Sequence, residues 1–468
     1  MSVNQASTNR SEATTTSHAP AKRDGFVTPF GVIAATLGSA VGLGNIWKFP
    51  ALTGANGGAT FLLIYLLSTL MVGLPIMIAE IALGRRARAD AITSLRKVAP
   101  SRLPWWLIGA SGVLAAFLIM AFYSEVAGWV FAYIFKSLSG SLLSTDPQIT
   151  SQAFTALVTN PTQSLLWQWI VLAFVGFIII LGVTKGIEQT TKRLMPVLFL
   201  LLIVLVIRSL TLPGAGAGLA FLFKPDFSKL NADVLLAAMG LSFFKLSVGM
   251  GTMITYGSYF REDQDIPKTA FTVMLADLTV SILAGIAIFP AVFTFGFKPE
   301  AGPSLLFITI PSIFASLPFG NVFVVMFFVL AAIAATGAML SIMEVPVAFL
   351  NERFKLARPL ATLLTMLLIG LVGSTAALSN SLLAEFKLFG MTMFDLFDFS
   401  TSNILLPVGG LFLALFTGWA FGRKNVVQEL TNHATLQNTW IVTAFFFVIR
   451  FVTPVLVLLI LLHGLGVL

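Results

Sequence analysis

Two glycine-interrupted segments carry the groups best suited to bind a ligand. Residues 40–44 read Ala-Val-Gly-Leu-Gly and residues 247–251 read Ser-Val-Gly-Met-Gly, each inside an apolar run long enough to cross a bilayer. Paired glycines disfavour continuous helix, and an unwound backbone leaves amides and carbonyls without partners. Half-helix N-termini would direct amides at a carboxylate, and bare carbonyls would hold a cation. We predict a shared mid-membrane site; small-residue helix packing is the structural alternative.

The composition indicates a membrane protein rather than a water-soluble one. Of its 468 residues, 57% are hydrophobic and 10% are charged, against about a quarter charged in a soluble domain. The net charge of +8 comes from basic residues in short segments between apolar runs, which the positive-inside rule explains. We therefore expect a lipid bilayer as a partner and no nucleic acid.

Catalytic chemistry has no support in the sequence. The absence of cysteine excludes disulfides and thiolate nucleophiles, and three scattered histidines form no metal cluster. No nucleophile stands with a base, and the glycine-rich segments follow no strand, so phosphate and dinucleotide sites are not expected. We predict neither enzymatic activity, nor catalytic residues, nor a covalent cofactor.

Hydropathy predicts an all-α polytopic membrane protein with about eleven transmembrane helices. The apolar runs lie near 27–50, 56–84, 104–137, 165–184, 192–212, 234–260, 267–298, 319–350, 359–378, 391–421 and 440–466. A further stretch near 302–317 is too short to span, and we interpret it as a partly buried outer loop or lid.

The spans divide into two related halves. Residues 1–24 form a disordered cytoplasmic tail, 25–212 the first five-helix repeat, 213–233 an outer loop, 234–425 the second repeat, and 426–468 the eleventh helix. Interruptions in corresponding spans predict a 5+5 inverted repeat with helices 1 and 6 broken. Basic residues in alternate connections predict a multi-pass protein of the cell inner membrane, with a cytoplasmic N-terminus and an outside C-terminus.

Motifs in and around the broken spans resemble the neurotransmitter:sodium symporter family. They are Gly38-Ser39-Ala40-Val41-Gly42-Leu43-Gly44-Asn45-Ile46-Trp47-Lys48-Phe49-Pro50, Glu80 with Gly84-Arg85, Phe122-Tyr123, Phe244-Lys245-Leu246-Ser247, Phe394-Asp395-Leu396-Phe397-Asp398 and Thr401-Ser402-Asn403. The eleven-span count is similar to the bacterial leucine and hydrophobic amino-acid transporters. This resemblance implies alternating-access secondary transport of a small neutral amino acid.

The resemblance implies a substrate pocket between spans one, three, six and eight. The amides of Gly42, Leu43 and Gly44 and the Tyr123 hydroxyl would hold the carboxylate, although Tyr123 as an interfacial belt residue is the structural alternative. The ammonium would lie at the carbonyls of Ala40, Phe244 and Ser247. The side-chain end would be lined by Ile119, Phe244, Met250, Ala338 and Ile342, which favours a hydrophobic or aromatic amino acid.

Two gates are implied in the same way. Lys48 and Asp398 would form the outer gate above Phe244, with a lysine where most relatives have an arginine. Arg23 and Glu352 would form the inner gate. Snorkelling or ordinary surface pairing is the alternative for both pairs.

The first ion site breaks the family pattern. Its region comprises Ala40, Asn45, Lys245 and Asp277, and Lys245 stands where the family has a hydroxyl. A mid-membrane lysine needs a partner, and Asp277 is the nearest match. Our hypothesis is a tethered cation that makes transport sodium-independent or proton-coupled through this pair; a permanently charged structural pair is the alternative. Asp277 also argues against chloride at Ser281.

The second ion site has lost its hydroxyls. Its region comprises Gly38, Val41, Ala334, Gly337 and Ala338, and the last two replace the family's hydroxyl residues. Neighbouring Thr336 would serve only if the helix were locally overwound or underwound. A second function therefore stays open: an amino-acid-sensing receptor with little or no transport. Sequence alone leaves the oligomeric state and the particular amino acid undetermined.

Overall fold

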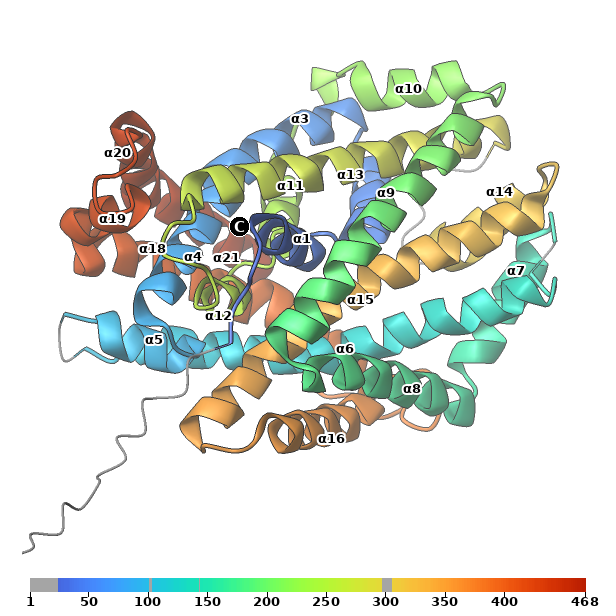
Figure 1. The fold of residues 1–468 in the computed structure, drawn as a ribbon. Helices are drawn as coiled ribbons and strands as arrows, with labels where there is room; N and C mark the ends of the chain where they lie inside the picture. The colour runs from blue at the N-terminus through green and yellow to red at the C-terminus, as the bar shows by residue number, and fades with distance from the viewer. Residues whose placement is uncertain (1–23, 101–102, 143, 297–304) are drawn as a thin grey trace, which may run out of the picture.

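The computed structural model describes residues 24–100, 103–142, 144–296 and 305–468. Within them the chain is helical, apart from one isolated bridge between Leu388 and Met391. The expected all-α fold is confirmed. Figure 1 shows long helices crossing one another around a centre where the broken segments lie.

The helices of the first half connect directly or through short π-helical turns (η). They are α1 Pro29–Ala40, η1 Gly44–Lys48, α2 Phe49–Ala55, α3 Ala59–Ser68, η2 Thr69–Gly73, α4 Leu74–Ala87, α5 Ala91–Val98, α6 Trp106–Leu138, α7 Pro147–Val158, α8 Pro161–Ile180, η3 Val183–Glu188, α9 Gln189–Leu210 and α10 Ala215–Phe223.

The second half continues the same pattern after the 3-10 turn η4. Its helices are η4 Phe227–Lys229, α11 Ala232–Lys245, α12 Thr252–Gly257, α13 Ile266–Thr294, η5 Leu305–Thr309, α14 Ile310–Ala315, α15 Gly320–Arg353, α16 Arg358–Ala377, α17 Met393–Phe399, η6 Ser400–Leu405, α18 Leu406–Leu415, η7 Phe416–Phe421, α19 Gly422–Leu430, α20 Thr439–Phe447, η8 Val448–Val452 and α21 Thr453–Gly464.

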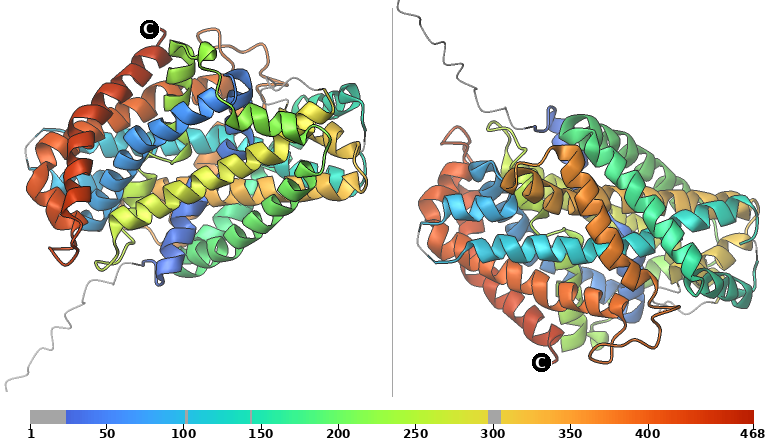
Figure 2. Two further views of the ribbon diagram at one scale, coloured as in Figure 1. Left: turned by 90° about the horizontal axis from the view of Figure 1, so that it is seen from above. Right: turned by 90° about the horizontal axis from the view of Figure 1, so that it is seen from below.

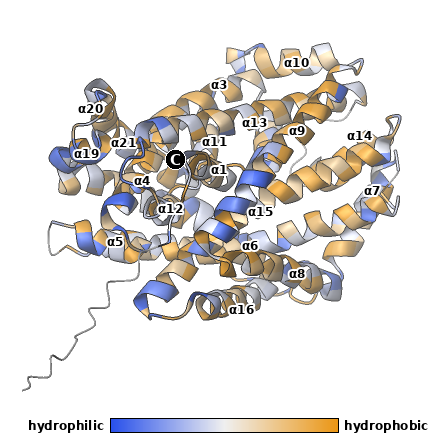
Figure 3. Cartoon of the chain, viewed as in Figure 1, coloured by the Kyte–Doolittle hydropathy of each residue, from blue (hydrophilic) through white to orange (hydrophobic). Residues whose placement is uncertain are grey.

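The number of spans agrees with the hydropathy. Nine helices of the described chain are long and apolar enough to cross a membrane. The pair 29–40 and 44–55, bent by 53°, makes a tenth. Helices α11 and α12, separated by residues 246–251, supply two halves of another broken span. Figure 3 shows apolar residues along most helix bodies and polar ones mainly at helix ends and turns.

Helices α6 and α15 pack along each other and support the centre of the molecule. Helix α15 is the most deeply buried span, whereas α9 and the final span present much of their surface outward. The described chain begins at one end of the bundle and finishes at the other (Figure 2). The two ends of the bundle are thus distinct surfaces that a ligand would reach from opposite sides of a membrane.

Both helix breaks occur at the glycine segments that the sequence singled out. Helix α1 ends as Val41 turns to extended backbone (φ −84°, ψ 94°). The second break needs positive φ at Gly249 (+81°) and Gly251 (+72°), a region open to glycine at little cost. Ser247 also has positive φ (+52°), which is uncommon for a residue with a Cβ and marks local strain.

The segments outside the spans are partly helical. Helix α7 lies between the apolar runs 104–137 and 165–184, and η5 with α14 occupies the described part of the stretch 302–317. Thr150 of α7 and Ser312 of α14 share a hydrogen bond (2.9 Å), and the rings of Phe154 and Phe307 stack at 4.9 Å. The described part of this stretch is thus mostly buried against α7 and its neighbours; its position as an outer loop or lid stays a prediction.

We expect Gly84→Ala to destabilise the second broken span. A Cβ at Gly84 would lie 1.9 Å from the carbonyl oxygen of Ile254, a backbone atom of α12 that cannot move alone. Overpacking of this kind costs about 1–3 kcal/mol, so thermal unfolding in detergent should shift downward. Gly216→Ala is the control, because nothing lies within 4 Å of its added methyl group. Equal melting temperatures for both variants would contradict the prediction.

Candidate functional site

A small cavity lies where the two helix breaks face each other. Its walls come from the first break, α6, the second break and α15. The lining residues are Ser39, Ala40, Gly42, Gly44, Ile119, Tyr123, Phe244, Lys245, Ser247, Met250, Ala338 and Ile342. Every residue predicted for the substrate site belongs to this set except Leu43, whose amide donates to the Tyr123 hydroxyl (3.0 Å). The fold thus gathers these residues around one space.

Neighbouring side chains form hydrogen bonds with some of the amides and carbonyls at the two helix breaks. The Ser247 hydroxyl donates to the carbonyl of Ser39 (2.7 Å), which ties the second break to the first. The amide of Gly249 donates to buried Glu80 Oε1 (2.7 Å). The sequence analysis identified Glu80 only as a motif residue. In the structure its carboxyl group accepts a hydrogen bond from an amide of the unwound segment, which would otherwise have no partner within its own helix.

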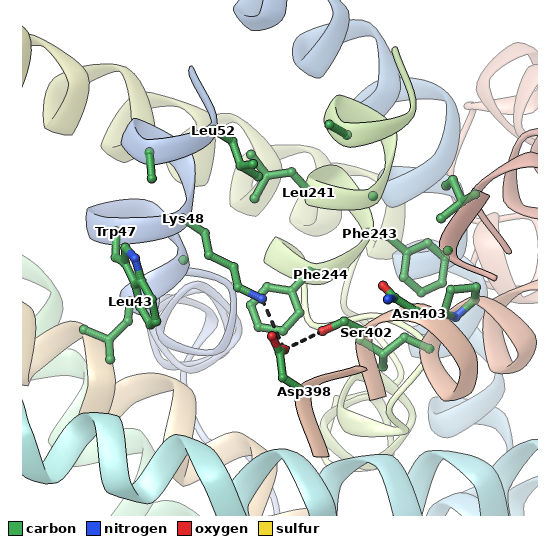
Figure 4. Close-up of a pocket in the computed structure, with 18 of the residues that line it drawn as sticks. Leu43, Trp47, Lys48, Leu52, Leu241, Phe243, Phe244, Asp398, Ser402 and Asn403 are labelled. Atoms are coloured by element: carbon green, nitrogen blue, oxygen red, sulfur yellow. Dashed lines mark hydrogen bonds and ion pairs between the residues drawn. The ribbon is translucent and has the colours of Figure 1, made fainter. Parts of the chain in front are cut away.

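A larger vestibule of ≈ 540 Å³ adjoins the cavity, and Figure 4 shows residues that line this vestibule. Lys48 Nζ lies 3.4 Å from Asp398 Oδ1 and 4.1 Å from the ring centre of Phe244, and Ser402 Oγ donates to Asp398 (2.8 Å). The predicted outer-gate residues are therefore in contact. Vestibule and cavity share the residues Gly44, Tyr123 and Phe244.

The other end of the bundle is closed by aromatic rings. Phe26 packs against Tyr256, Tyr259 and Phe260 with ring centroids 5.5, 6.0 and 6.3 Å away. Its amide donates to the Tyr259 carbonyl (3.2 Å). This cluster seals the route from the cavity to the end opposite the vestibule.

The predicted inner gate is only partly described. Arg23 lies outside the described residues, and Glu352 Oε2 accepts from the amide of Asp90 (2.8 Å). Instead, Glu188 holds the start of the first span by accepting from the amides of Val27 (2.8 Å) and Thr28 (3.2 Å). Sequence reasoning missed Glu188; its position between the fourth and fifth apolar runs was the available signal.

A second buried carboxylate anchors α15 to α16. Glu344 accepts hydrogen bonds from both terminal nitrogens of Arg358 (3.0 and 2.6 Å) and from the Tyr259 hydroxyl (2.7 Å). Such a forked pair fixes both side chains in one geometry. The signal that sequence reasoning passed over was a glutamate inside a long apolar run, which is costly unless it is paired.

Lys245 occupies a fully enclosed pocket of oxygen atoms. Its Nζ lies 3.2 Å from Asp277 Oδ2 and donates to the Tyr65 hydroxyl (3.0 Å) and to the Ser281 hydroxyl. Neither Lys245 nor Asp277 exposes any side-chain surface. The structure thus brings together the predicted pair and adds Tyr65, whose role the sequence did not reveal because its partner lies far along the chain.

Asn45 joins this pocket to the first break. Its Nδ2 donates to Asp277 Oδ1 (2.7 Å) and to the Ser281 hydroxyl (3.2 Å), while its Oδ1 accepts from the amide of Gly42 (3.3 Å). The side chain of Asn45 thus links the backbone at Gly42, which lines the cavity, to the buried ion pair.

Comparison with known proteins decides the family. The model of the sodium:neurotransmitter symporter family matches residues 23–153 and 151–467. The chain belongs to this family. It is therefore a multi-pass membrane transporter and not an enzyme, as the motifs and the helix count had predicted.

Several relatives of this symporter match it over nearly their whole length. The "Uncharacterized sodium-dependent transporter YhdH" of Bacillus subtilis is 40% identical over 95% of this chain and 98% of its own. An "Uncharacterized sodium-dependent transporter" of Haemophilus influenzae is 35% identical over 92% and 95%. The crystal structure of MhsT in complex with L-phenylalanine is 42% identical, with a TM-score of 0.87 over 95% of this chain and 100% of that one.

The region of the symporter's second ion site is closed by backbone packing. A Cβ placed on Gly337 of α15 would lie 2.7 Å from the carbonyl oxygen of Gly38 in α1. Helix α1 therefore packs against α15 at a distance that leaves no room for a side chain at position 337. The remaining residues predicted for this region, all buried, are Val41, Ala334 and Ala338.

Thr336 does not replace the missing hydroxyls in this conformation. Helix α15 runs unbroken through this position, and the Thr336 hydroxyl donates to the Ala332 carbonyl within the same helix (2.7 Å). The local overwinding or underwinding that would redirect it is absent from α15. The Thr336 hydroxyl is thus engaged within its own helix.

We expect Asp277→Asn to destabilise this symporter strongly. The substitution leaves the Lys245 ammonium buried without a counter-charge, which costs about 3–5 kcal/mol. Thermal unfolding in detergent measures the loss, and the double variant Lys245→Met with Asp277→Asn should recover most of it. Asp398→Asn is the control, because its half-exposed pair with Lys48 is worth below ~1 kcal/mol. A single variant as stable as the control would refute the prediction.

Proposed function

We propose that this symporter carries a neutral amino acid with a hydrophobic or aromatic side chain by alternating access. The observation that carries the proposal is the cavity between the two helix breaks. There, the backbone of residues 42–44 faces the Tyr123 hydroxyl, which already accepts from the amide of Leu43. Amide donors and a phenol suit a carboxylate, and carbonyls such as that of Ala40 suit an ammonium group.

The rest of the cavity supports an apolar substrate side chain. Ile119, Met250, Ala338 and Ile342 bring no charge to it. Methionine is flexible and polarizable, so Met250 would adapt to side chains of different shape. The solved complex of the similar MhsT with L-phenylalanine points to the same class of ligand.

Access from one end only supports the alternating mechanism. The vestibule reaches down to Phe244, while the Phe26 cluster closes the opposite end. Substrate would enter past Lys48 and Asp398, whose contact is part-exposed and loose enough to open. We propose that the vestibule faces outward and that the N-terminal end is cytoplasmic, in a bacterial inner membrane, because Arg85, Arg261 and the α19 helix gather at that end.

We further propose that transport does not use sodium at the two family sites. Relatives are named sodium-dependent, yet here an ammonium with three oxygen partners stands in the first site. At the second, Gly38 and Gly337 pack directly. The full set of partners around Lys245 favours a permanently charged pair over proton exchange at Lys245 and Asp277, which leaves the driving ion to another group.

A sensing receptor is the second candidate. It would use the same cavity without net movement of the ligand, and the altered ion sites are the observation in its favour. Counterflow separates the two, because exchange of labelled for unlabelled amino acid across a membrane requires a transport cycle and a receptor performs none.

We predict that proteoliposomes exchange labelled L-phenylalanine and that Tyr123→Phe weakens its binding. Removing a hydroxyl that meets a carboxylate costs roughly 1.5–3 kcal/mol, or about ten- to a hundredfold in Kd. Tyr133→Phe is the control: this phenol lies on the same helix, and its hydroxyl has no partner among the described residues. Unchanged affinity in Tyr123→Phe, or binding without counterflow, would oppose the proposed transport.

We predict that uptake proceeds without sodium and that Lys245→Thr introduces sodium dependence. The threonine removes the tethered ammonium and leaves Asp277, Asn45 and Ser281 free to surround a cation of similar charge. Uptake and melting temperature are measured with sodium and proton gradients varied separately. Lys268→Thr, exposed on α13, is the control and should stay sodium-insensitive. Strict dependence of the unmodified protein on sodium would defeat this proposal.

A further inference from the structure

Glu125 is a buried carboxyl group that the proposed cycle does not use. It lies in α6 with 1% of its surface exposed, and neither of its carboxyl oxygens has a hydrogen-bond partner within the described chain. Every other buried carboxyl there accepts at least one hydrogen bond. These carboxyl groups are Glu80, Asp90, Glu188, Asp277, Glu344 and Glu429.

An ionised carboxylate in this position would have neither water nor a counter-charge. Burying an unpaired charge in a low-dielectric interior is so costly that the group takes up a proton instead. Glutamate is therefore compatible with this site only as the neutral acid while the site stays dry. Any movement that admits water would remove that restriction.

Charged groups on the helices that pack extensively on α6 are all engaged elsewhere or lie at helix ends. Helices α8 and α18 and the turn η6 carry none. On α15 and α16, Glu344 pairs with Arg358, and Glu352 and Arg353 lie at the end of α15. On α17, Asp395 accepts a hydrogen bond from Thr392 and Asp398 pairs with Lys48. On α5, Arg96 lies over the Trp106 ring and Lys97 donates to the Ala87 carbonyl.

Aromatic rings cover the surface of α6 on which Glu125 lies. Phe122 and Trp129 flank it one turn away on either side, and both contact Phe394, with ring centroids 5.4 and 6.2 Å apart. Phe394 begins α17, the helix that also carries the outer-gate residue Asp398. The vestibule wall thus separates Glu125 from vestibule water.

We propose that Glu125 is a proton-binding site linked to the position of α17 and therefore to the outer gate. With Phe394 packed on α6 the carboxyl group is dry and holds its proton. When α17 moves away, water enters, and the O–H proton passes to water to leave a hydrated carboxylate. Proton binding then favours the covered arrangement, so low pH closes the vestibule wall and rising pH opens it.

The absence of cysteine from the chain permits a direct test. Val126, a vestibule-lining neighbour with 1% exposure, is replaced by cysteine as a reporter. Its rate of modification by a membrane-impermeant methanethiosulfonate is measured from pH 6 to 8.5 and divided by the rate of a free thiol at each pH. We expect the normalised rate to rise with pH, by up to about tenfold per unit for one linked proton.

Glu125→Gln keeps the shape of the neutral acid and cannot ionise, so its normalised rate should stay flat. Glu385→Gln, an exposed residue shortly before α17, makes the same change of charge and should keep the rise. A flat profile with Glu125 present, or a rise that persists in Glu125→Gln, would overturn the proposal. So would a rise that vanishes when sodium replaces choline, because the carboxylate would then be a sodium site.

Thermal unfolding gives a second readout that a structural role alone would not move. Glu125→Gln should have a higher melting temperature than the unmodified protein, and the difference should grow from pH 6 to pH 8, because the unfolded chain releases the glutamate proton above about pH 4.3 while the folded chain retains it. The inference rests on the proposed function only for the meaning of the vestibule as the substrate route. If L-phenylalanine shows counterflow but the modification rate of the cysteine does not change with pH, only the proton site is refuted. If the modification rate changes with pH but there is no counterflow, only transport is refuted.

Discussion

The need to satisfy backbone polar groups inside a bilayer governs the centre of this protein. Hydrocarbon offers no hydrogen bonds, so a helix can unwind there only where protein supplies the partners. Both breaks meet this condition: Ser247 reaches the first break, Glu80 supports the second, and Tyr123 meets the amide of Leu43. The groups still bare around the cavity are the ones a zwitterion can satisfy, so the fold and the ligand site are one structural feature.

In the two regions predicted to bind ions, the protein's own atoms occupy the space by different physical means. In the first, a covalently attached ammonium supplies the charge that Asp277, Asn45 and the hydroxyls of Tyr65 and Ser281 surround. In the second, two glycines let α1 and α15 approach until backbone fills the space. A mobile cation couples to transport because it can leave. A tethered ammonium and a packed backbone cannot leave the protein, so neither would couple transport to an ion gradient.

The sequence predicted most of the fold, because apolar runs and paired glycines are local signals. It also predicted the Lys245 and Asp277 pair, because a lysine inside a span must have a counter-charge. The roles of Tyr65 and Glu188 and the packing of Phe394 on Phe122 were missed, since each depends on which side chains meet across distant segments. The close approach of Gly38 and Gly337 was beyond sequence as well: missing hydroxyls indicate lost ligands, but only coordinates show that backbone occupies the space.

A fixed charge in place of a mobile ion changes what the rest of the molecule must do. The charge of Lys245 is attached to the chain and cannot be released, so in our proposal it does not by itself make the outer gate respond to an ion gradient. A group that gains or loses its charge with hydration would restore such a response, provided that a gate helix controls its access to water. Glu125 meets both conditions in our proposal, because it is neutral only while dry, and Phe394, which packs on the neighbouring rings of Phe122 and Trp129, belongs to the helix carrying Asp398. In our proposal, the titratable carboxyl group of Glu125 thus supplies the response to a gradient that the fixed charge of Lys245 does not.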